Sequence, residues 1–431
     1  MLFQRGAAER AESQYLTEAA NPDNRKSPMP PPRQSRSCVI VVENLPVPLD
    51  RRVWQEAQAL TRAGWSVSVI CPATADFPKR FEVIDDVAVY RHALPFEARG
   101  ALAYFVEYSA ALFHQFRLLI KVHRERGFSI IQACNPPDLI FLPVLPFKLM
   151  GKKFIFDQHD VAPELFIVKF GAKGFLYRAL MFFERMSYAM ADHVITANAT
   201  FKDIAVSRGG KAPSLIEVVY GVPDRKRIHR VAPETGLHGG RKFLLGYLGI
   251  INEQDGVDHL VRAVADLVKV KGFRDFRAVV VGSGPALEKV RALTRALEVE
   301  DFLSFPGYLS GESLLAHISA FDIGVIPDPL NEANDLMSMN KVFEYCALGI
   351  PTACYPLKET KRLLGEAGVY APSHDPAGLA DACLSLMQDA CLRGRCAEEA
   401  AKLSAEAFLW EKEARKYVAT YERALGGLRS D

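Results

Sequence analysis

The stretch Ser338–Pro351, SMNKVFEYCALGIP, carries a cation and a carboxylate at a spacing suited to chemistry on a charged ligand. Ser338 is of the N-cap type, and Gly349 followed by a proline marks a C-terminus, so the stretch predicts a short helix. Lys341 and Glu344 are three residues apart and therefore share one face of that helix. A lysine in the first turn opposes the helix dipole at a cost of about 0.3–1 kcal/mol. A bound anion at the helix N-terminus would offset this cost.

A carboxylate one turn after such an anion site suits a pair of vicinal hydroxyls, because it accepts two hydrogen bonds. A phosphate at the helix N-terminus with a diol beside it describes a nucleotide sugar. The alternative is an ordinary amphipathic helix with one Lys–Glu pair, and the local spacing alone favours that alternative.

Length and composition limit the classes of protein that need to be considered. The chain has 431 residues, of which 49% are hydrophobic, so it can bury two or three domain cores. The formal net charge of +2 gives no nucleic-acid footprint. The eight cysteines lack CxxC spacing, which favours a reduced, cytoplasmic environment without a zinc site. No apolar run is long enough to span a bilayer, and residues 1–36 resemble a disordered tail.

Residues 37–220 alternate short apolar runs with helical periods, which predicts a doubly wound α/β domain with a parallel sheet. Its strands are expected at 38–42, 67–70, 129–133, 154–157, 193–197 and 216–220, with a small hairpin over 81–90. Residues 221–242 are rich in Pro, Gly, Arg and His and predict a linker.

After this linker the alternation restarts over residues 243–395, so a second doubly wound domain is expected. Its strands are predicted at 243–249, 277–281, 302–305, 322–326 and 352–355. Helices over 376–388 and 396–425 would close the chain. Two such sheets in series would form a cleft between the domains.

Five segments, in this order and spacing, resemble the glycosyltransferase family 4 group: VVENLPVPLDRRVWQEA, FDQHDVAPELF, YLGIINEQDGVDHL, VVVGSGP and DLMSMNKVFEYCALGIPTA. The resemblance covers nearly everything after Ser37. It implies the GT-B fold, in which two Rossmann-like domains face each other across a cleft and the last helix crosses back to the first domain. It also implies a nucleotide-sugar donor, retention at the anomeric centre and no requirement for a metal or another cofactor.

On the donor side, Glu344 matches the second glutamate of the family's Glu–seven residues–Glu pattern, which implies that it holds the ribose hydroxyls. The first glutamate is missing: Leu336 stands at its place, and Asp335, one residue earlier, is the candidate substitute at the donor sugar. The family's phosphate-binding Arg and Lys are also missing, with Ile250 and Asp255 at those places.

Two buried phosphates still need compensating charge. Lys341, at the helix N-terminus, is the strongest remaining candidate. Further hydrogen bonds to the donor are expected from Asn252, Gln254, Asn340 and the Gly256 backbone.

Gly282 and Gly284 follow a buried strand and open a helix. A lone GxG is often only a tight turn, and here it lacks the third glycine of a dinucleotide fingerprint. The resemblance places this loop beside the donor nucleotide, where its backbone would contact the donor.

His159, in FDQHD, lies just after a predicted strand of the first domain. It matches the family histidine that approaches the donor sugar and its phosphate, and histidine titrates near neutrality. The alternatives are a structural loop histidine or a metal ligand together with Asp157 and Asp160.

The first loop carries four candidates for the acceptor side, which are Glu43, Asn44, Asp50 and Arg51. Asp50 also has a sufficient structural role as an N-cap. Arg51 and Arg52 would meet an anionic acceptor or remain solvated.

An aromatic and basic segment of the first domain suggests peripheral contact with anionic lipid, or else core aromatics with snorkelling lysines. It comprises Phe147, Lys148, Lys152, Lys153, Phe166, Lys169, Phe170, Lys173, Phe175, Tyr177 and Arg178.

Together with the residues above, the resemblance implies a glycosyltransferase that moves a sugar from a nucleotide-diphosphate sugar to a saccharide or lipid-linked acceptor, by analogy in cell-envelope polysaccharide biosynthesis. The resemblance also implies that the leaving diphosphate oxygen takes the acceptor proton, so no protein nucleophile is required. The missing glutamate and the missing Arg/Lys pair keep two alternatives open: a degenerate sugar-nucleotide-binding or scaffold protein, and a GT-B-like epimerase. A nicotinamide dehydrogenase is the least favoured, because its fingerprint is incomplete.

Overall fold

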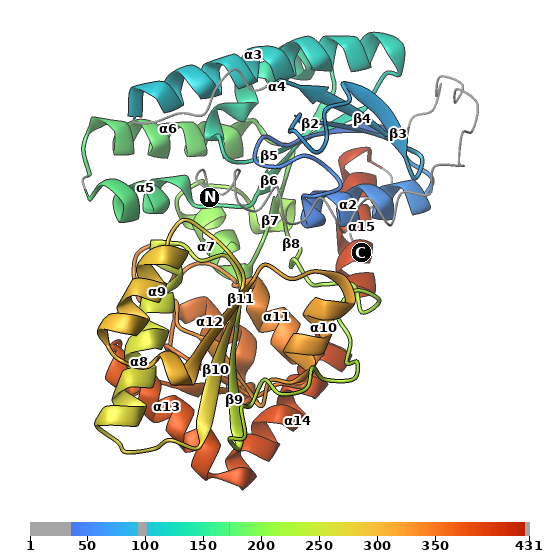
Figure 1. Cartoon of the computed structure of the whole chain (residues 1–431). Helices are drawn as coiled ribbons and strands as arrows, with labels where there is room; N and C mark the ends of the chain where they lie inside the picture. The colour runs from blue at the N-terminus through green and yellow to red at the C-terminus, as the bar shows by residue number, and fades with distance from the viewer. Residues whose placement is uncertain (1–35, 94–100, 172, 427–431) are drawn as a thin grey trace. The chain divides into compact units, whose positions relative to one another are not determined.

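The computed structural model describes residues 36–93, 101–171 and 173–426 (Figure 1). Contacts divide these residues into two compact units. The first unit holds the described residues up to Tyr220 together with those from Glu411 onward, and the second runs from Gly221 to Trp410. Most of the predicted tail lies outside the described residues.

The first unit is built on an eight-stranded sheet in the order β3-β4-β2-β1-β5-β6-β7-β8. Every neighbouring pair is parallel except β3 and β4. The strands are β1 (Ser37–Val41), β2 (Ser66–Pro72), β3 (Phe81–Ile84), β4 (Val87–His92), β5 (Ile130–Cys134), β6 (Lys153–Gln158), β7 (His193–Thr196) and β8 (Ile216–Val218). The predicted hairpin is confirmed, and its second strand also joins the main sheet beside β2.

Helices cover this sheet. Successive side chains of each strand point to opposite faces of the sheet, so neighbouring residues pack against different helices. The helices are α2 (Arg51–Arg62), α3 (Ala101–Glu125), α4 (Phe141–Leu149), α5 (Ala162–Phe170), α6 (Phe175–Met190), α7 (Ala199–Ser207) and α15 (Trp410–Ala424). Ile131 and Ala133 of β5 belong to the apolar core that also contains residues of α3, α4 and α6. Gln132 between them points to the opposite face, where it meets α2 and α15. Figure 1 shows these two helices near each other.

The second unit contains a six-stranded parallel sheet in the order β11-β10-β9-β12-β13-β14. The strands are β9 (Phe243–Leu248), β10 (Phe276–Val281), β11 (Leu303–Gly307), β12 (Ile323–Ile326), β13 (Thr352–Cys354) and β14 (Gly368–Tyr370). The doubly wound architecture predicted for both halves is therefore confirmed.

Helices flank the second sheet on both faces, with α8 and α9 on one side and α10 and α11 on the other (Figure 1). The helices are α8 (Val257–Lys269), α9 (Leu287–Ala296), α10 (Gly311–Ser319), α11 (Asn340–Ala347), α12 (Lys358–Leu364), α13 (Pro376–Gln388) and α14 (Ala390–Glu406). The single closing helix expected over 396–425 is wrong, because α14 ends at Glu406 and α15 starts at Trp410. Within the described residues, no helix combines the length and the apolar character needed to cross a membrane.

Candidate functional site

His159 sits where β6 ends, in a cluster of charged side chains contributed by β6 and α2. Its Nε2 lies 2.9 Å from Asp157 Oδ2, and the Arg52 guanidinium lies 3.1 Å from Asp157 Oδ1. Arg52 Nε is also 3.2 Å from His159 Nε2. The Asp157 side chain is fully buried, whereas that of His159 is 12% exposed. The carboxyl end of a parallel strand thus presents the histidine at the edge where such sheets bind ligands.

The charges of this cluster determine its proton affinities. Burial alone would lower the pKa of His159, but the charge and hydrogen bond of Asp157 outweigh it and raise that pKa above its ordinary value. Burial would raise the pKa of Asp157, yet Arg52 and His159 hold it well below its usual range. Burial and the charge of Asp157 raise the pKa of Glu56 to about 8. An ionised Asp157 therefore favours a protonated histidine.

Gln132 lies behind Asp157 in the middle of β5. Its Nε2 donates to Asp157 Oδ2 and to Glu56 Oε2, at 2.9 Å each. Its Oε1 accepts from the hydroxyls of Tyr417 and Tyr421 of α15, at 2.7 and 2.6 Å. Sequence reasoning missed this residue. A single amide within the apolar run IIQAC, next to a strand that ends in FDQHD, was the available signal.

Arg52 corrects one sequence-based alternative, because its guanidinium has internal hydrogen-bond partners and is not simply solvated. Besides Asp157 it bonds the Val219 carbonyl at 2.7 Å, and its side chain is 14% exposed. The neighbouring Arg51 is the exposed member of the pair.

The sequence left open a metal site at His159. The structure offers one group of residues for it, because the ligand atoms of Cys134, Asp157 and His159 lie within 4.8 Å of one another. These residues do not fit a cation well. The Arg52 guanidinium touches two of them, and burial and the charge of Asp157 raise the pKa of the Cys134 thiol, which favours the protonated form that does not bind metals. Asp160, the third residue of the sequence-based alternative, is not in the group.

The acceptor-side candidates lie around the end of β1 and the start of α2. Glu43 is buried, accepts from Gln115 Nε2 at 2.5 Å and lies 3.2 Å from His92 Nε2. Asp50 caps α2 by accepting from Val53 N at 3.1 Å, as its structural interpretation predicted. Asn44 is half-buried. The hydrogen bonds of Glu43 and Asp50 within the first unit therefore account for the presence of these two candidates.

In the second unit, α11 begins at Asn340 and its N-cap is Met339, without a side-chain capping bond. The prediction that Ser338 caps this helix is wrong. Asn340 is exposed and Glu344 is half-buried.

Lys341 is buried, and its Nζ donates to Asp328 Oδ2 at 2.6 Å while lying 5.0 Å from the centre of the Tyr247 ring. Asp328 lies two residues after the end of β12. Burial raises the pKa of Asp328, Lys341 opposes that rise, and the charge of Asp255 adds to it. The Lys341 ammonium, which was predicted to bind a phosphate, is thus already paired with the Asp328 carboxylate. Sequence reasoning missed this ion pair.

Asp335 and the loop after β9 also have internal partners. Asp335 Oδ1 accepts from Lys358 N at 2.8 Å, so it caps α12. Asn252 and Asp255 form a reciprocal capping box on the short helix η3 (Glu253–Asp255). The backbone carbonyl oxygen of Gln254 accepts a hydrogen bond from Asn334 Nδ2 at 2.9 Å.

Gly282 and Gly284 let two loops meet backbone to backbone. A Cβ on Gly282, whose φ is 143°, would lie 1.8 Å from the Gly249 carbonyl oxygen. A Cβ on Gly284 would lie 2.4 Å from the Ile251 carbonyl oxygen. Loop packing therefore requires both glycines, whatever ligand the loops bind.

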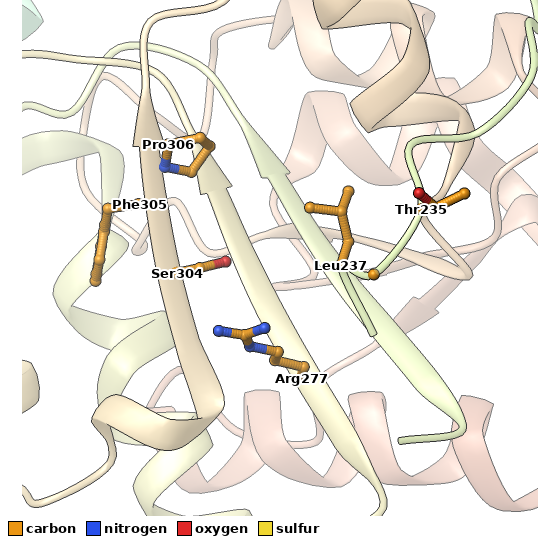
Figure 2. Close-up of a pocket in the computed structure, with 7 residues that line it drawn as sticks. Thr235, Leu237, Arg277, Ser304, Phe305 and Pro306 are labelled. Carbon is orange, nitrogen blue, oxygen red and sulfur yellow. The ribbon is translucent and has the colours of Figure 1, made fainter. Parts of the chain in front are cut away.

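A separate pocket of about 370 Å³ lies over the edge of the second sheet (Figure 2). It is lined by Thr235, Gly236, Leu237, Arg277, Ser304, Phe305 and Pro306. None of the predicted site residues lines it.

Two family models match the chain on either side of the boundary between the units. Residues 49–221 match a glycosyl transferase 4-like domain, and residues 242–389 match glycosyl transferases group 1. Alpha-D-kanosaminyltransferase of Streptomyces kanamyceticus is 29% identical over 37% of this chain and 40% of its own length. D-inositol 3-phosphate glycosyltransferase of Corynebacterium diphtheriae is 29% identical over 41% of this chain and 42% of its own. The chain thus spans less than half the length of these relatives.

Solved structures agree on the fold. Sucrose-phosphate synthase from Thermosynechococcus elongatus superposes with a TM-score of 0.73 at 16% identity, covering 91% of this chain and 100% of that one. Anabaena HepE in complex with UDP-glucose gives a TM-score of 0.67 at 14% identity, covering 90% and 99%. These structures and the two doubly wound sheets show the GT-B fold. The two family models, which together span residues 49–221 and 242–389, identify the chain as a member of the family 4-like glycosyltransferases.

Proposed function

We propose that this protein transfers a sugar from a nucleotide-diphosphate sugar to a hydroxyl acceptor. The observation that carries the proposal is the His159–Asp157–Arg52 cluster at the ligand-binding edge of the first sheet, within a chain matched by both family models. His159 Nε2 is committed to Asp157, which leaves Nδ1 for the donor sugar or its phosphate. A protonated histidine there would stabilise the charge that develops on the leaving diphosphate.

The second unit would bind the nucleotide. Glu344 is suited to the ribose hydroxyls, and the exposed Asn340 at the start of α11 is suited to the phosphates. Because Lys341 is paired with Asp328, it would act mainly by holding α11 against β12. The solved complexes of HepE with UDP and with UDP-glucose make a uridine nucleotide the first donor to test.

The reaction is proposed to proceed with retention and without a metal. The leaving diphosphate oxygen would remove the acceptor proton, so the residues position the reactants and stabilise charge rather than attack the sugar. The acceptor is proposed to be a saccharide or a lipid-linked saccharide of the cell envelope, modified at the cytoplasmic membrane face.

The membrane assignment is supported by apolar side chains that α4 to α6 leave exposed. Leu149 is 81% exposed and Phe175 is 83% exposed. The membrane face, as the term is used below, comprises Leu142, Leu145, Leu149, Met150, Phe170, Phe175, Leu176 and Phe182. Exposed Lys153, Lys169 and Lys173 flank it, as expected for contact with anionic lipid. Phe147, predicted to belong to this surface, is instead buried in the core.

The proposal is tested by incubating the protein with UDP-, GDP- and dTDP-sugars and a panel of lipid-linked and free saccharides, with and without EDTA. We expect one nucleotide to be released in step with a new glycoside of unchanged anomeric configuration, read by NMR, and unaffected by EDTA. Nucleotide binding without turnover on any acceptor would favour the binding-protein alternative. A new sugar nucleotide formed without acceptor would favour an epimerase.

A further inference from the structure

Gln132 has all of its hydrogen-bonding capacity used inside the first unit. Its carbonyl oxygen accepts two hydroxyls, and its amide nitrogen donates to two carboxylates. An amide offers two donors and two acceptor sites, so the residue is saturated. It is fully buried, as are Tyr417 and Tyr421.

The two tyrosines determine which way the amide faces. Their hydroxyls converge on Oε1, which leaves Nε2 to point at Asp157 and Glu56. If the amide turned over, its N–H groups would face the hydroxyls and its oxygen would face two carboxylates. The packing of α15 against β5 therefore keeps the Gln132 amide nitrogen as a donor to Asp157 Oδ2. The same oxygen contacts His159 Nε2.

Charged groups from several elements face His159. Arg52 and Glu56 come from α2, and Asp50 precedes that helix. Asp157 comes from β6, and Asp160 follows that strand. Among these groups, Asp157 is the one that both bonds the imidazole and bonds Gln132. A change at Gln132 thus reaches the histidine through one shared oxygen atom.

We propose that Gln132 is a positioning residue that couples the seating of α15 to the orientation and proton affinity of His159. The inference rests on the proposed function for the meaning of His159, but the coupling itself can be measured without activity. Helix α15 begins with Trp410, which belongs to the second unit, and continues into the first.

The direction of the effect follows from how the oxygen is shared. When Gln132 no longer donates, Asp157 Oδ2 carries more uncompensated charge and binds the imidazolium more tightly, so the pKa of His159 rises. Gln132→Leu removes the donor directly. Tyr417→Phe combined with Tyr421→Phe removes the anchors, so that the amide can turn its oxygen toward Asp157.

The experiment is a pH titration of the full chain labelled with ¹³C-histidine, followed by NMR. The chain has ten histidines, and the His159 signal is assigned as the one missing from His159→Gln. We expect the proton affinity of His159 to rise about threefold to tenfold in Gln132→Leu and in the double tyrosine variant, one pKa unit being a tenfold change. The single variants Tyr417→Phe and Tyr421→Phe should give smaller rises.

The matched control is Tyr188→Phe, which removes a buried hydroxyl from α6 of the same unit. It should leave the His159 titration unchanged, and thermal unfolding confirms that each variant is folded. An unshifted His159 in folded Gln132→Leu, or an equal shift in Tyr188→Phe, would overturn the inference. With a confirmed donor, the alkaline limb of kcat/KM should move to higher pH in Gln132→Leu, in step with the His159 titration. Full activity of His159→Gln would sink the proposed role of the histidine and leave the titration result standing.

Discussion

At the scale of single residues, His159 owes its raised pKa to an aspartate that is itself kept ionised by an arginine. Arg52 lies 3.1 Å from Asp157 Oδ1, and His159 Nε2 lies 2.9 Å from Oδ2. An ordinary histidine titrates near pH 6.5, whereas His159 should stay protonated to a higher pH. If the protonated form supports transfer, activity is present below the raised pKa and is lost as the pH rises through it.

Asp157→Asn should therefore lower the pKa of His159 and shift the alkaline limb of kcat/KM to lower pH, with an activity loss of about tenfold or more at pH 8. The measurement is a pH–rate profile with the identified donor. Asp322→Asn is the control, because Asp322 forms a comparable 3.0 Å contact with His238 in the second unit. A limb that stays in place after Asp157→Asn would contradict the assignment.

Glu344→Gln should weaken nucleotide binding about tenfold, which corresponds to about 1.4 kcal/mol, because an amide offers one acceptor oxygen in place of two to the ribose hydroxyls. Calorimetry with UDP measures the change. Glu398→Gln, at an exposed position of α14, should bind as the unaltered protein does. Equal affinities for all three proteins would remove Glu344 from the nucleotide site.

The residue types and their order along the chain predicted His159 at a strand end and Asp50 as a cap. They did not predict the contacts of Lys341. Its partner Asp328 lies thirteen positions away on another element, and local spacing carries no information on which side chains meet between elements. The same limit concealed Gln132, whose partners Tyr417 and Tyr421 are more than 280 residues away.

At the scale of elements, the strands followed their predicted bounds closely, because buried parallel strands are short continuous apolar runs. Helices α5, α7 and α12 were not predicted. They have nine, nine and seven residues, too few to show a clear period. Strand β14 was missed because its three residues are only half-buried.

The pairing of α11 with the end of β12 through Lys341 and Asp328 makes a prediction about stability. Lys341→Met leaves a buried carboxylate and Asp328→Asn leaves a buried ammonium, so each should cost about 3–5 kcal/mol of unfolding free energy. The double variant should cost less than the sum of the two. Urea unfolding of the four proteins completes the cycle, and strict additivity would show that the contact contributes nothing.

At the scale of the whole molecule, the proposed membrane face consists of apolar side chains that the core of the first unit leaves exposed. Leu149→Ser combined with Phe175→Ser should weaken binding to anionic vesicles about tenfold or more, since burying one such side chain contributes about 1.5–3 kcal/mol. Co-sedimentation with phosphatidylglycerol vesicles measures this. Phe81→Ser, at a 48% exposed position on β3, is the control. Equal losses for both changes would indicate a general loss of solubility instead.

The path of the chain also has a practical consequence. The polypeptide leaves the first unit at Tyr220 and re-enters it at Glu411, so the second unit is an insertion between two segments of the first. A fragment truncated near Tyr220 would lack the hydroxyls that satisfy Gln132 and the ring of Tyr421 that packs 5.2 Å from Trp65. Anyone preparing the amino-terminal half in isolation would need to splice residues 411–426 back onto it through a short artificial connector.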